Sequence, residues 1–311
     1  MNYRRLGRSG LQVTELTYGT ALTVGTEILS SGPTFELILA AWEGGIRSFD
    51  TSSNYGSAEA LLGEALRQYP RHEYVLASKG SWPIGPGRYD RGLSRKHLVH
   101  ALERSLTNLA TPYLDIYYAH RFDTEVELEE VVRTFGQFLQ SGKILYWGTS
   151  EWTQTQLEAL HGCCDALGVE RPIVEQPIFS YAIHKIRENG VKSFCEQNGV
   201  GVMGFSPLAQ GLLTGKYRRE VPPQSRIAKS QQINYSKTTA IYEQNRERID
   251  GFLSVVEAQG VDPVAVALQW CVRQSVLPVV GASRPEQVLD NIRALETEIP
   301  ESVFQALEKL P

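Results

Sequence analysis

Four side chains with complementary acid–base chemistry follow short apolar runs near the start of the chain: Asp50, Tyr55, Lys79 and His120. A tyrosine hydroxyl, with an unperturbed pKa of about 10, is a poor acid–base catalyst unless a nearby cation stabilises its phenolate. Lys79 supplies a cation, and Asp50 keeps that ammonium charged and fixed, because a buried lysine without a partner tends to lose its proton. His120 is suited to orient a carbonyl oxygen. The set therefore predicts proton donation to a carbonyl by Tyr55.

Each of these residues also has a purely structural interpretation when it is taken alone. Asp50 is typical of a turn or helix cap, Tyr55 of packing, Lys79 of a solvated strand end, and His120 of a hydrogen-bonded core histidine. The catalytic interpretation requires that the fold bring all four together.

Eight short apolar runs alternate with amphipathic helical segments along the chain. The runs lie at 16–20, 46–52, 74–80, 113–120, 144–150, 172–177, 201–207 and 276–282. This alternation is typical of βα units, and eight units favour a closed (β/α)8 TIM barrel, which we expect to be a single domain over residues 1–311. The rival, an open doubly wound sheet, lacks its GxGxxG signature, because the first run continues as GTALTVGTE.

Barrel active sites lie at the C-terminal ends of the strands, and Asp50, Lys79 and His120 end three consecutive runs. The opening YRRLGRSGLQV predicts an N-terminal hairpin that covers the opposite end of the barrel. The stretch from about 208 to 237 is rich in Gly, Pro, Ser and Gln, which predicts a long functional loop after strand 7.

Composition excludes several classes of protein. A formal charge of −4 and a pI near 5.9 make nucleic acid an unexpected partner. The start of the chain has no apolar leader, and no run approaches the roughly 18 apolar residues of a membrane span, so we expect a cytoplasmic protein without membrane insertion. The four cysteines form neither a CxxC motif nor a disulfide framework and predict reduced thiols. A homo-oligomer is compatible with the sequence, which leaves the assembly state open.

Seven ordered segments resemble the aldo-keto reductase family: FDTSSNYGSAEALLGEAL, ASKG, YLDIYYAHRFD, LQSGKILYWGTSEW, EQP, GFSPLAQGLLTGKY and GASRPEQVLDNI. Within the family, RGLSRKHL, YWGTSEW and SPLAQGLLTGKY are most similar to the branch of voltage-gated potassium-channel beta subunits and bacterial glyceraldehyde 3-phosphate reductases. The resemblance implies a catalytic tetrad of Asp50, Tyr55, Lys79 and His120. It also implies reduction of a small aldehyde or ketone, in which NADPH delivers hydride and is converted to NADP+.

Without a Rossmann loop, a dinucleotide must be held by strand ends and loops whose backbone amides and cations meet its phosphates. The resemblance implies stacking of Phe205 on the nicotinamide, and a preference for NADPH given by Lys216, Arg226 and Arg284. The structural alternatives are a core role for Phe205 and a surface role for each cation. The remaining cofactor contacts implied by the resemblance are Thr20, Ser150, Gln176, Ser206, Pro207, Leu208, Gln210, Ser283, Gln287, Asp290 and Asn291. Glu151 departs from the asparagine, and Asp290 from the glutamate, that are common in the family.

Three aromatic residues after strand ends, Trp82, Trp152 and Tyr181, are candidates for the wall of a substrate pocket, although aromatics there also pack loops. His97 and His100 have the spacing of helical metal ligands, but no third ligand follows, so we expect no metal site. A serine nucleophile elbow is excluded because a leucine replaces the last glycine of GxSxG in GFSPL.

Two other functions stay open. The first is a regulatory or channel-associated subunit that holds NADPH with slow or vestigial turnover, although channel beta subunits of the branch carry asparagine where this chain has His120. The second is a Schiff-base lyase, because a strand-end lysine of depressed pKa is a nucleophile, and Asp50 argues against a neutral Lys79.

Overall fold

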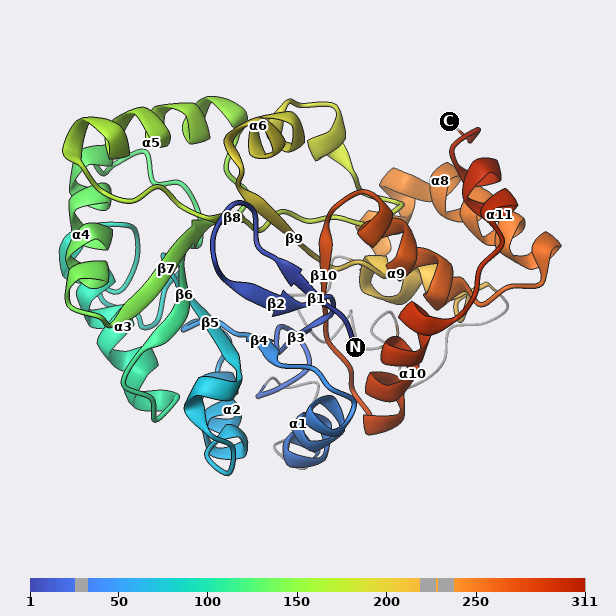
Figure 1. The fold of residues 1–311 in the computed structure, drawn as a ribbon, viewed down its shortest axis with the longest axis horizontal. Helices are drawn as coiled ribbons and strands as arrows, with labels where there is room; N and C mark the ends of the chain where they lie inside the picture. Colours follow the sequence, from blue (N-terminus) through green and yellow to red (C-terminus); the bar gives the residue numbers. More distant parts are fainter. Residues whose placement is uncertain (26–32, 219–227, 229–237, 311) are drawn as a thin grey trace.

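The computed structural model describes residues 1–25, 33–218, 228 and 238–310. Within them, eight parallel strands close into a barrel that is surrounded by helices (Figure 1). In order around the barrel, the strands are β10 (Leu277–Val280), β3 (Thr17–Gly19), β4 (Ser48–Asp50), β5 (Val75–Gly80), β6 (Leu114–Ala119), β7 (Ile144–Thr149), β8 (Val174–Glu175) and β9 (Gly201–Phe205). Every strand lies inside one of the eight predicted runs, which confirms the (β/α)8 barrel.

The helices of the described residues cover the outside of the strands (Figure 1). They are α1 (Thr34–Glu43), α2 (Ala58–Leu66), α3 (Arg95–Asn108), α4 (Leu128–Gln140), α5 (Gln154–Leu167), α6 (Val191–Asn198), α8 (Thr238–Gln259), α9 (Pro263–Arg273), α10 (Pro285–Glu296) and α11 (Glu301–Leu307). Short 3-10 helices are η1 (Arg71–Glu73), η2 (Lys185–Arg187) and η3 (Ala209–Thr214). Local sequence explains both ends of α5: Thr153 and Gln156 form a capping box before the helix, and Gly168 ends it at a φ of 64°.

Side-chain alternation along the strands separates a barrel interior from a shell under the helices. Interior side chains form one apolar cluster that includes Ala77, Ile116, Tyr118 and Met203. Because successive side chains point to opposite faces of a strand, Lys79 faces the same way as Ala77. Side chains that face inward at the ends of several strands therefore meet at the same barrel mouth.

An antiparallel hairpin of β1 (Tyr3–Arg5) and β2 (Gln12–Thr14) lies across the ring of strands, in dark blue in Figure 1. Its Leu6 and Val13 are fully buried in the interior cluster. The Thr14 amide donates to Ser48 Oγ at the start of β4, so the hairpin closes the N-terminal end of the barrel. The predicted hairpin is confirmed, and the polar strand ends are left at the opposite mouth.

The loop predicted from about 208 to 237 begins with η3, and residues 219–227 and 229–237 lie outside the described residues. All four cysteines are free thiols, and only Cys163 is more than slightly exposed. Within the described residues, no single helix has the length and apolar character needed to cross a membrane, and only the bent pair α8 and α9 meets those criteria jointly.

A buried histidine on α5 makes stability depend on pH. The residue, His161, is 5% exposed, its ring centroid lies 5.0 Å from that of Phe194, and neither ring nitrogen has a hydrogen-bond partner among the described residues. Burial, reinforced by the charge of Arg171, lowers the pKa of His161 from 6.5 to about 4. Between these values the unfolded chain binds a proton that the folded chain does not, so stability falls as pH decreases through that window.

Replacing His161 with leucine is therefore expected to make the free energy of unfolding less dependent on pH between pH 6.5 and about 4. The slope should decrease by the contribution of roughly one proton. Urea unfolding of the variant and the wild type across that range measures the slope. The exposed His72, replaced in the same way, is the control. Equal slopes for wild type and His161→Leu would contradict the assignment.

Candidate active site

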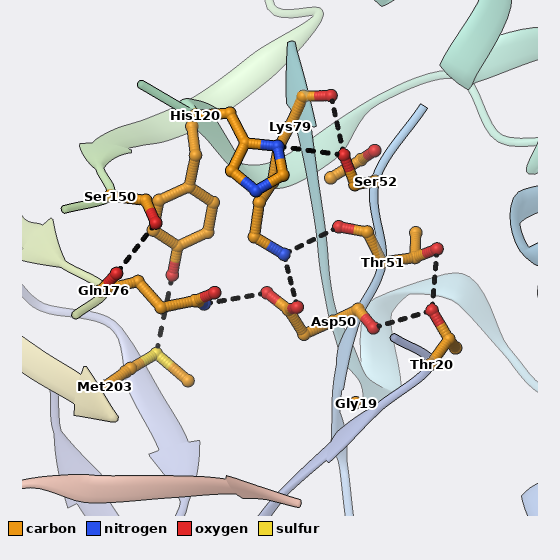
Figure 2. Close-up of polar contacts among 12 residues, drawn as sticks. Gly19, Thr20, Asp50, Thr51, Ser52, Lys79, His120, Ser150, Gln176 and Met203 are labelled. Carbon is orange, nitrogen blue, oxygen red and sulfur yellow. Dashed lines mark hydrogen bonds and ion pairs between the residues drawn. The ribbon is translucent and has the colours of Figure 1, made fainter. Parts of the chain in front are cut away.

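A buried ion pair joins the ends of neighbouring strands β4 and β5 (Figure 2). Lys79 is fully buried and Asp50 is 3% exposed. The Lys79 ammonium donates to Asp50 Oδ1 and, at 2.8 Å, to the Thr51 carbonyl oxygen. Gln176 on the far side of the barrel donates from Nε2 to Asp50 Oδ2 at 2.9 Å. Both carboxylate oxygens are thus satisfied, and the ammonium is fixed in position.

Burial and neighbouring charges shift the pKa values of Lys79 and His120 at this mouth. Burial lowers the pKa of the Lys79 ammonium, and the adjacent Asp50 carboxylate opposes that shift. Burial also holds the pKa of His120 well below 6.5, with further contributions from the positive charges of Lys79 and Arg121. The His120 imidazole is therefore neutral near pH 7.

Tyr55 lies in the turn after β4, where its backbone amide donates to the Ser52 carbonyl oxygen at 3.1 Å. Its half-buried ring has its centroid 5.4 Å from Lys79 Nζ and 6.0 Å from the His120 ring, to which it stands edge-on. The structure thus brings together Asp50, Tyr55, Lys79 and His120, as the catalytic interpretation requires.

Further predicted cofactor contacts surround the ion pair (Figure 2). The Thr20 hydroxyl lies 3.2 Å from the Asp50 carbonyl oxygen and 2.9 Å from the Thr51 hydroxyl. Ser150 donates from Oγ to the Gln176 carbonyl oxygen at 2.8 Å and accepts from Arg121 at 3.0 Å. These contacts make the mouth a continuous polar network.

Strained backbone follows several strands at this mouth. Leu22, Glu151 and Ser206 follow β3, β7 and β9 with φ values of 60°, 62° and 58°. Non-glycine residues adopt such values at a cost, and they concentrate at functional sites. The Glu151 carboxylate accepts from the Ile178 amide, which ties its loop to the next one.

The loop after β9 carries the first of the two predicted phosphate-binding segments. Phe205 ends the strand, is partly exposed and pairs with Val279 of β10. Beyond it, Pro207 is buried, Leu208 is partly buried, and Gln210 has a φ of 56° and accepts from the Thr238 hydroxyl at 2.6 Å. Lys216 is exposed, whereas Arg226 lies outside the described residues.

The second segment follows the neighbouring strand β10 and opens α10. The amide and hydroxyl of Ser283 donate to Gln287 Oε1 at 2.9 and 3.0 Å, and exposed Arg284 is the residue that precedes the helix. Asp290 is exposed and pairs with Arg293 at 3.2 Å, whereas Asn291 is 6% exposed. The two segments therefore leave the mouth from adjacent strands.

The three aromatic candidates have different environments. Trp82 is 42% exposed and stands edge-on to His120, with ring centroids 6.4 Å apart. Trp152 is buried, packs edge-on against Phe122 and donates to the Ala119 carbonyl oxygen. Tyr181 is buried and donates to the Leu307 carbonyl oxygen at 2.8 Å. The contacts of the last two are packing contacts, and a role for them in a pocket wall stays an untested prediction.

Sequence reasoning missed two polar residues at the mouth. Arg121 lies 5.7 Å over the Trp82 ring and bonds to Ser150, and Ser52 Oγ lies 3.2 Å from His120 Nδ1. Arg121 directly follows the strand-end His120, and this position alone would have indicated a residue of the barrel mouth. No pattern in the sequence indicated Ser52. Among the described residues, no group of three or more His, Cys, Asp or Glu is arranged to hold a metal.

Comparison with known proteins identifies the family to which this chain belongs. The model of the aldo/keto reductase family matches residues 15–311. A putative voltage-gated potassium channel subunit beta from Schizosaccharomyces pombe is 34% identical over 302 residues, which cover 94% of this chain and 88% of the relative. Probable subunits of the same description from Arabidopsis thaliana and Oryza sativa subsp. japonica are 34% and 33% identical, over 95% and 100% of this chain and 92% and 95% of the relatives. The chain therefore belongs to the aldo/keto reductase family, a family of oxidoreductases.

Proposed function

We propose that this protein is an NADPH-dependent reductase of aldehydes and ketones, with Tyr55 as the general acid. The observation that carries the proposal is the solvent-excluded Asp50–Lys79 pair, whose ammonium lies 5.4 Å from the Tyr55 ring centroid. A fixed ammonium stabilises the negative charge that develops on Tyr55 as its proton passes to the carbonyl oxygen. Asp50 holds that ammonium in place, and neutral His120 contacts the oxygen of the substrate or product.

The residues at the mouth fit a nicotinamide dinucleotide by the chemistry of their donor groups. The bound cofactor supplies hydride to the carbonyl carbon. Hydroxyl and amide groups of Thr20, Ser150 and Gln176 lie beside the ion pair and would hold the nicotinamide end. Exposed Lys216 and Arg284, on the loops after β9 and β10, would hold the phosphates, aided by the N-terminus of α10.

The direct test follows the loss of reduced nicotinamide absorbance when purified protein is mixed with NADPH or NADH and a panel of carbonyls. The panel contains glyceraldehyde 3-phosphate, methylglyoxal, 4-nitrobenzaldehyde and simple ketones. NADPH-linked turnover of a panel member supports the proposal. Tight NADPH binding without turnover of any of them contradicts it.

Replacing Arg284 with alanine is expected to raise the KM for NADPH more than that for NADH, because only NADPH carries a 2′-phosphate to pair with the guanidinium. One charge-assisted hydrogen bond is worth about 1.5–3 kcal/mol, so the rise for NADPH is roughly ten-fold or more. Arg273→Ala is the control, because Arg273 lies on α9 and pairs with Glu301. Equal rises for both cofactors would mean that Arg284 does not read the 2′-phosphate.

A second candidate function is a regulatory subunit that binds NADPH and associates with a channel. It is favoured by the names of the relatives, which describe voltage-gated potassium channel beta subunits. His120 argues for turnover but leaves a second binding role open. Retention of the purified protein on detergent-solubilised channel protein, with and without NADPH, separates the two roles.

The Schiff-base lyase alternative makes a different prediction about Lys79. Two hydrogen bonds and complete burial hold its ammonium in the ion pair, which disfavours attack on a carbonyl. Borohydride treatment in the presence of an aldehyde is therefore expected to leave Lys79 unmodified. A covalent adduct on Lys79 would replace the reductase mechanism by a lyase mechanism.

A further inference from the structure

The buried hydroxyl of Ser52 has three polar neighbours among the described residues. Its Oγ lies 2.6 Å from Asn54 Oδ1, 3.4 Å from the Lys79 carbonyl oxygen and 3.2 Å from His120 Nδ1. Ser52 is 1% exposed and His120 is 5% exposed, whereas Asn54 is partly exposed. Figure 2 shows Ser52 between the Lys79 carbonyl and the imidazole. The contact between Ser52 and His120 is therefore shielded from water.

A serine hydroxyl has one proton to donate and two lone pairs with which it accepts. Two of the three neighbours of Ser52 are carbonyl oxygens, which only accept. In the amide orientation that the structure gives Asn54, Oδ1 faces Ser52, and the proton goes to this nearer oxygen because otherwise lone pairs would face each other at 2.6 Å. The remaining neighbour, His120 Nδ1, must then carry a proton and donate it to Ser52 Oγ.

A neutral imidazole carries a proton on only one of its two nitrogens. Burial, together with the positive charges of Lys79 and Arg121, keeps His120 neutral near pH 7. If Nδ1 holds the ring proton, Nε2 is a bare lone pair. Nε2 can then accept a hydrogen bond from a hydroxyl group but has nothing to donate to a carbonyl oxygen.

We propose that Ser52 and Asn54 are positioning residues that hold the ring proton of His120 on Nδ1, so that Nε2 accepts a hydrogen bond from an alcohol. The proposal rests on the reductase function proposed above and deepens it. It changes the role expected of His120 from the sequence, because a carbonyl oxygen would receive no hydrogen bond from this tautomer.

In the reaction, this tautomer would form a hydrogen bond with the alcohol product but not with the carbonyl substrate. In reduction, the carbonyl carbon gains a hydride from the reduced nicotinamide and the oxygen gains the proton of Tyr55, which is left as a phenolate beside Lys79 and recovers a proton from solvent. The new hydroxyl group then has a proton to donate to His120 Nε2, and the ring keeps its single proton throughout. His120 therefore binds the alcohol in preference to the carbonyl compound.

The tautomer is measured by 15N NMR of protein labelled in its histidine side chains, because protonated and unprotonated ring nitrogens have well-separated chemical shifts. His120→Asn identifies the His120 signals by their disappearance. In the wild-type protein we expect a protonated Nδ1 and an unprotonated Nε2. A proton on Nε2 would overturn the proposal.

Ser52→Ala removes the acceptor of the Nδ1 proton, and we expect the Nε2-protonated tautomer to become populated. Ser53→Ala is the matched control, because the adjacent Ser53 hydroxyl donates to the Lys79 carbonyl oxygen at 2.9 Å and has no hydrogen bond to His120 within the described chain. Asn54→Ala tests the other end of the relay: it frees the Ser52 proton for Nδ1, and the same shift in population is expected. An Nδ1 proton that persists in both Ser52→Ala and Asn54→Ala rules out the relay.

The catalytic half of the proposal is tested with 4-nitrobenzaldehyde as substrate and 4-nitrobenzyl alcohol as product inhibitor. Ser52→Ala is expected to raise the inhibition constant of the alcohol by roughly 2- to 10-fold, the net value of one hydrogen bond, and to change the KM of the aldehyde less. Ser53→Ala should alter neither constant, whereas equal changes in both for Ser52→Ala would overturn the preference for alcohol. If the aldehyde is not reduced at all, the reductase function is in doubt, and the NMR experiment still decides the tautomer.

Discussion

Replacing Tyr55 with phenylalanine is expected to lower the rate of carbonyl reduction by about 10²–10⁴-fold, the usual contribution of a general acid. Phenylalanine keeps the ring that lies 5.4 Å from Lys79 Nζ and edge-on to His120, but it removes the only proton that the proposed mechanism delivers to the carbonyl oxygen. Because Tyr55 is not among the proposed phosphate or nicotinamide contacts, the affinity for NADPH should change little. Steady-state rates and fluorescence titration with NADPH measure the two quantities separately.

The control for this variant is Tyr89→Phe, because Tyr89 is 59% exposed on the loop that carries Trp82. It should retain the wild-type rate. Turnover by Tyr55→Phe at a rate close to that of the wild type would remove Tyr55 from the role of proton donor. A parallel loss of NADPH affinity would instead mean that the hydroxyl shapes the cofactor site.

The fold was predictable because each barrel strand is a short apolar run between turns. Such strands are buried on both faces, so they read as continuous apolar runs that stand out from the amphipathic helical segments. Even β8, with only two residues in the ladder, could be located from the run PIVEQP. The convergence of the proposed catalytic residues was predictable for a related reason. Asp50, Lys79 and His120 lie at strand ends, so the closure of the barrel alone brings them to one mouth.

What the sequence did not reveal depends on rotamers and on contacts between distant segments. Tyr181 follows a strand region, yet its hydroxyl bonds to Leu307, and nothing in the local sequence indicates that contact. The hydrogen bond between Ser52 and His120 likewise joins residues that are 68 positions apart. Proton positions follow from such contacts, so the proposed tautomer of His120 could not be inferred from residue types alone.

The same closure creates a cost in stability at the centre of the site. A buried ammonium and carboxylate lose their hydration, and their attraction compensates for that loss only while both partners are present and hydrogen-bonded. Lys79 and Asp50 meet this condition through Thr51 and Gln176. A gain in stability is therefore a weak explanation of the pair, and the proposed mechanism offers another, a fixed cation beside Tyr55.

Replacing Lys79 with methionine is accordingly expected to lower the free energy of unfolding by about 3–5 kcal/mol, because the variant leaves the Asp50 carboxylate buried without its cation. It should also abolish measurable carbonyl reduction, since no cation remains to stabilise the Tyr55 phenolate. Urea unfolding gives the first quantity, and NADPH consumption with 4-nitrobenzaldehyde gives the second.

The double variant Asp50→Asn/Lys79→Met separates the two effects. It removes both charges and keeps a polar group opposite Gln176, so most of the lost stability should return while reduction stays absent. Recovery of activity together with stability would mean that Lys79 serves only to neutralise Asp50. If Lys79→Met were as stable as the wild type, the Asp50 carboxylate would not depend on Lys79 for charge compensation. The ion pair would then not be what fixes the geometry of the site.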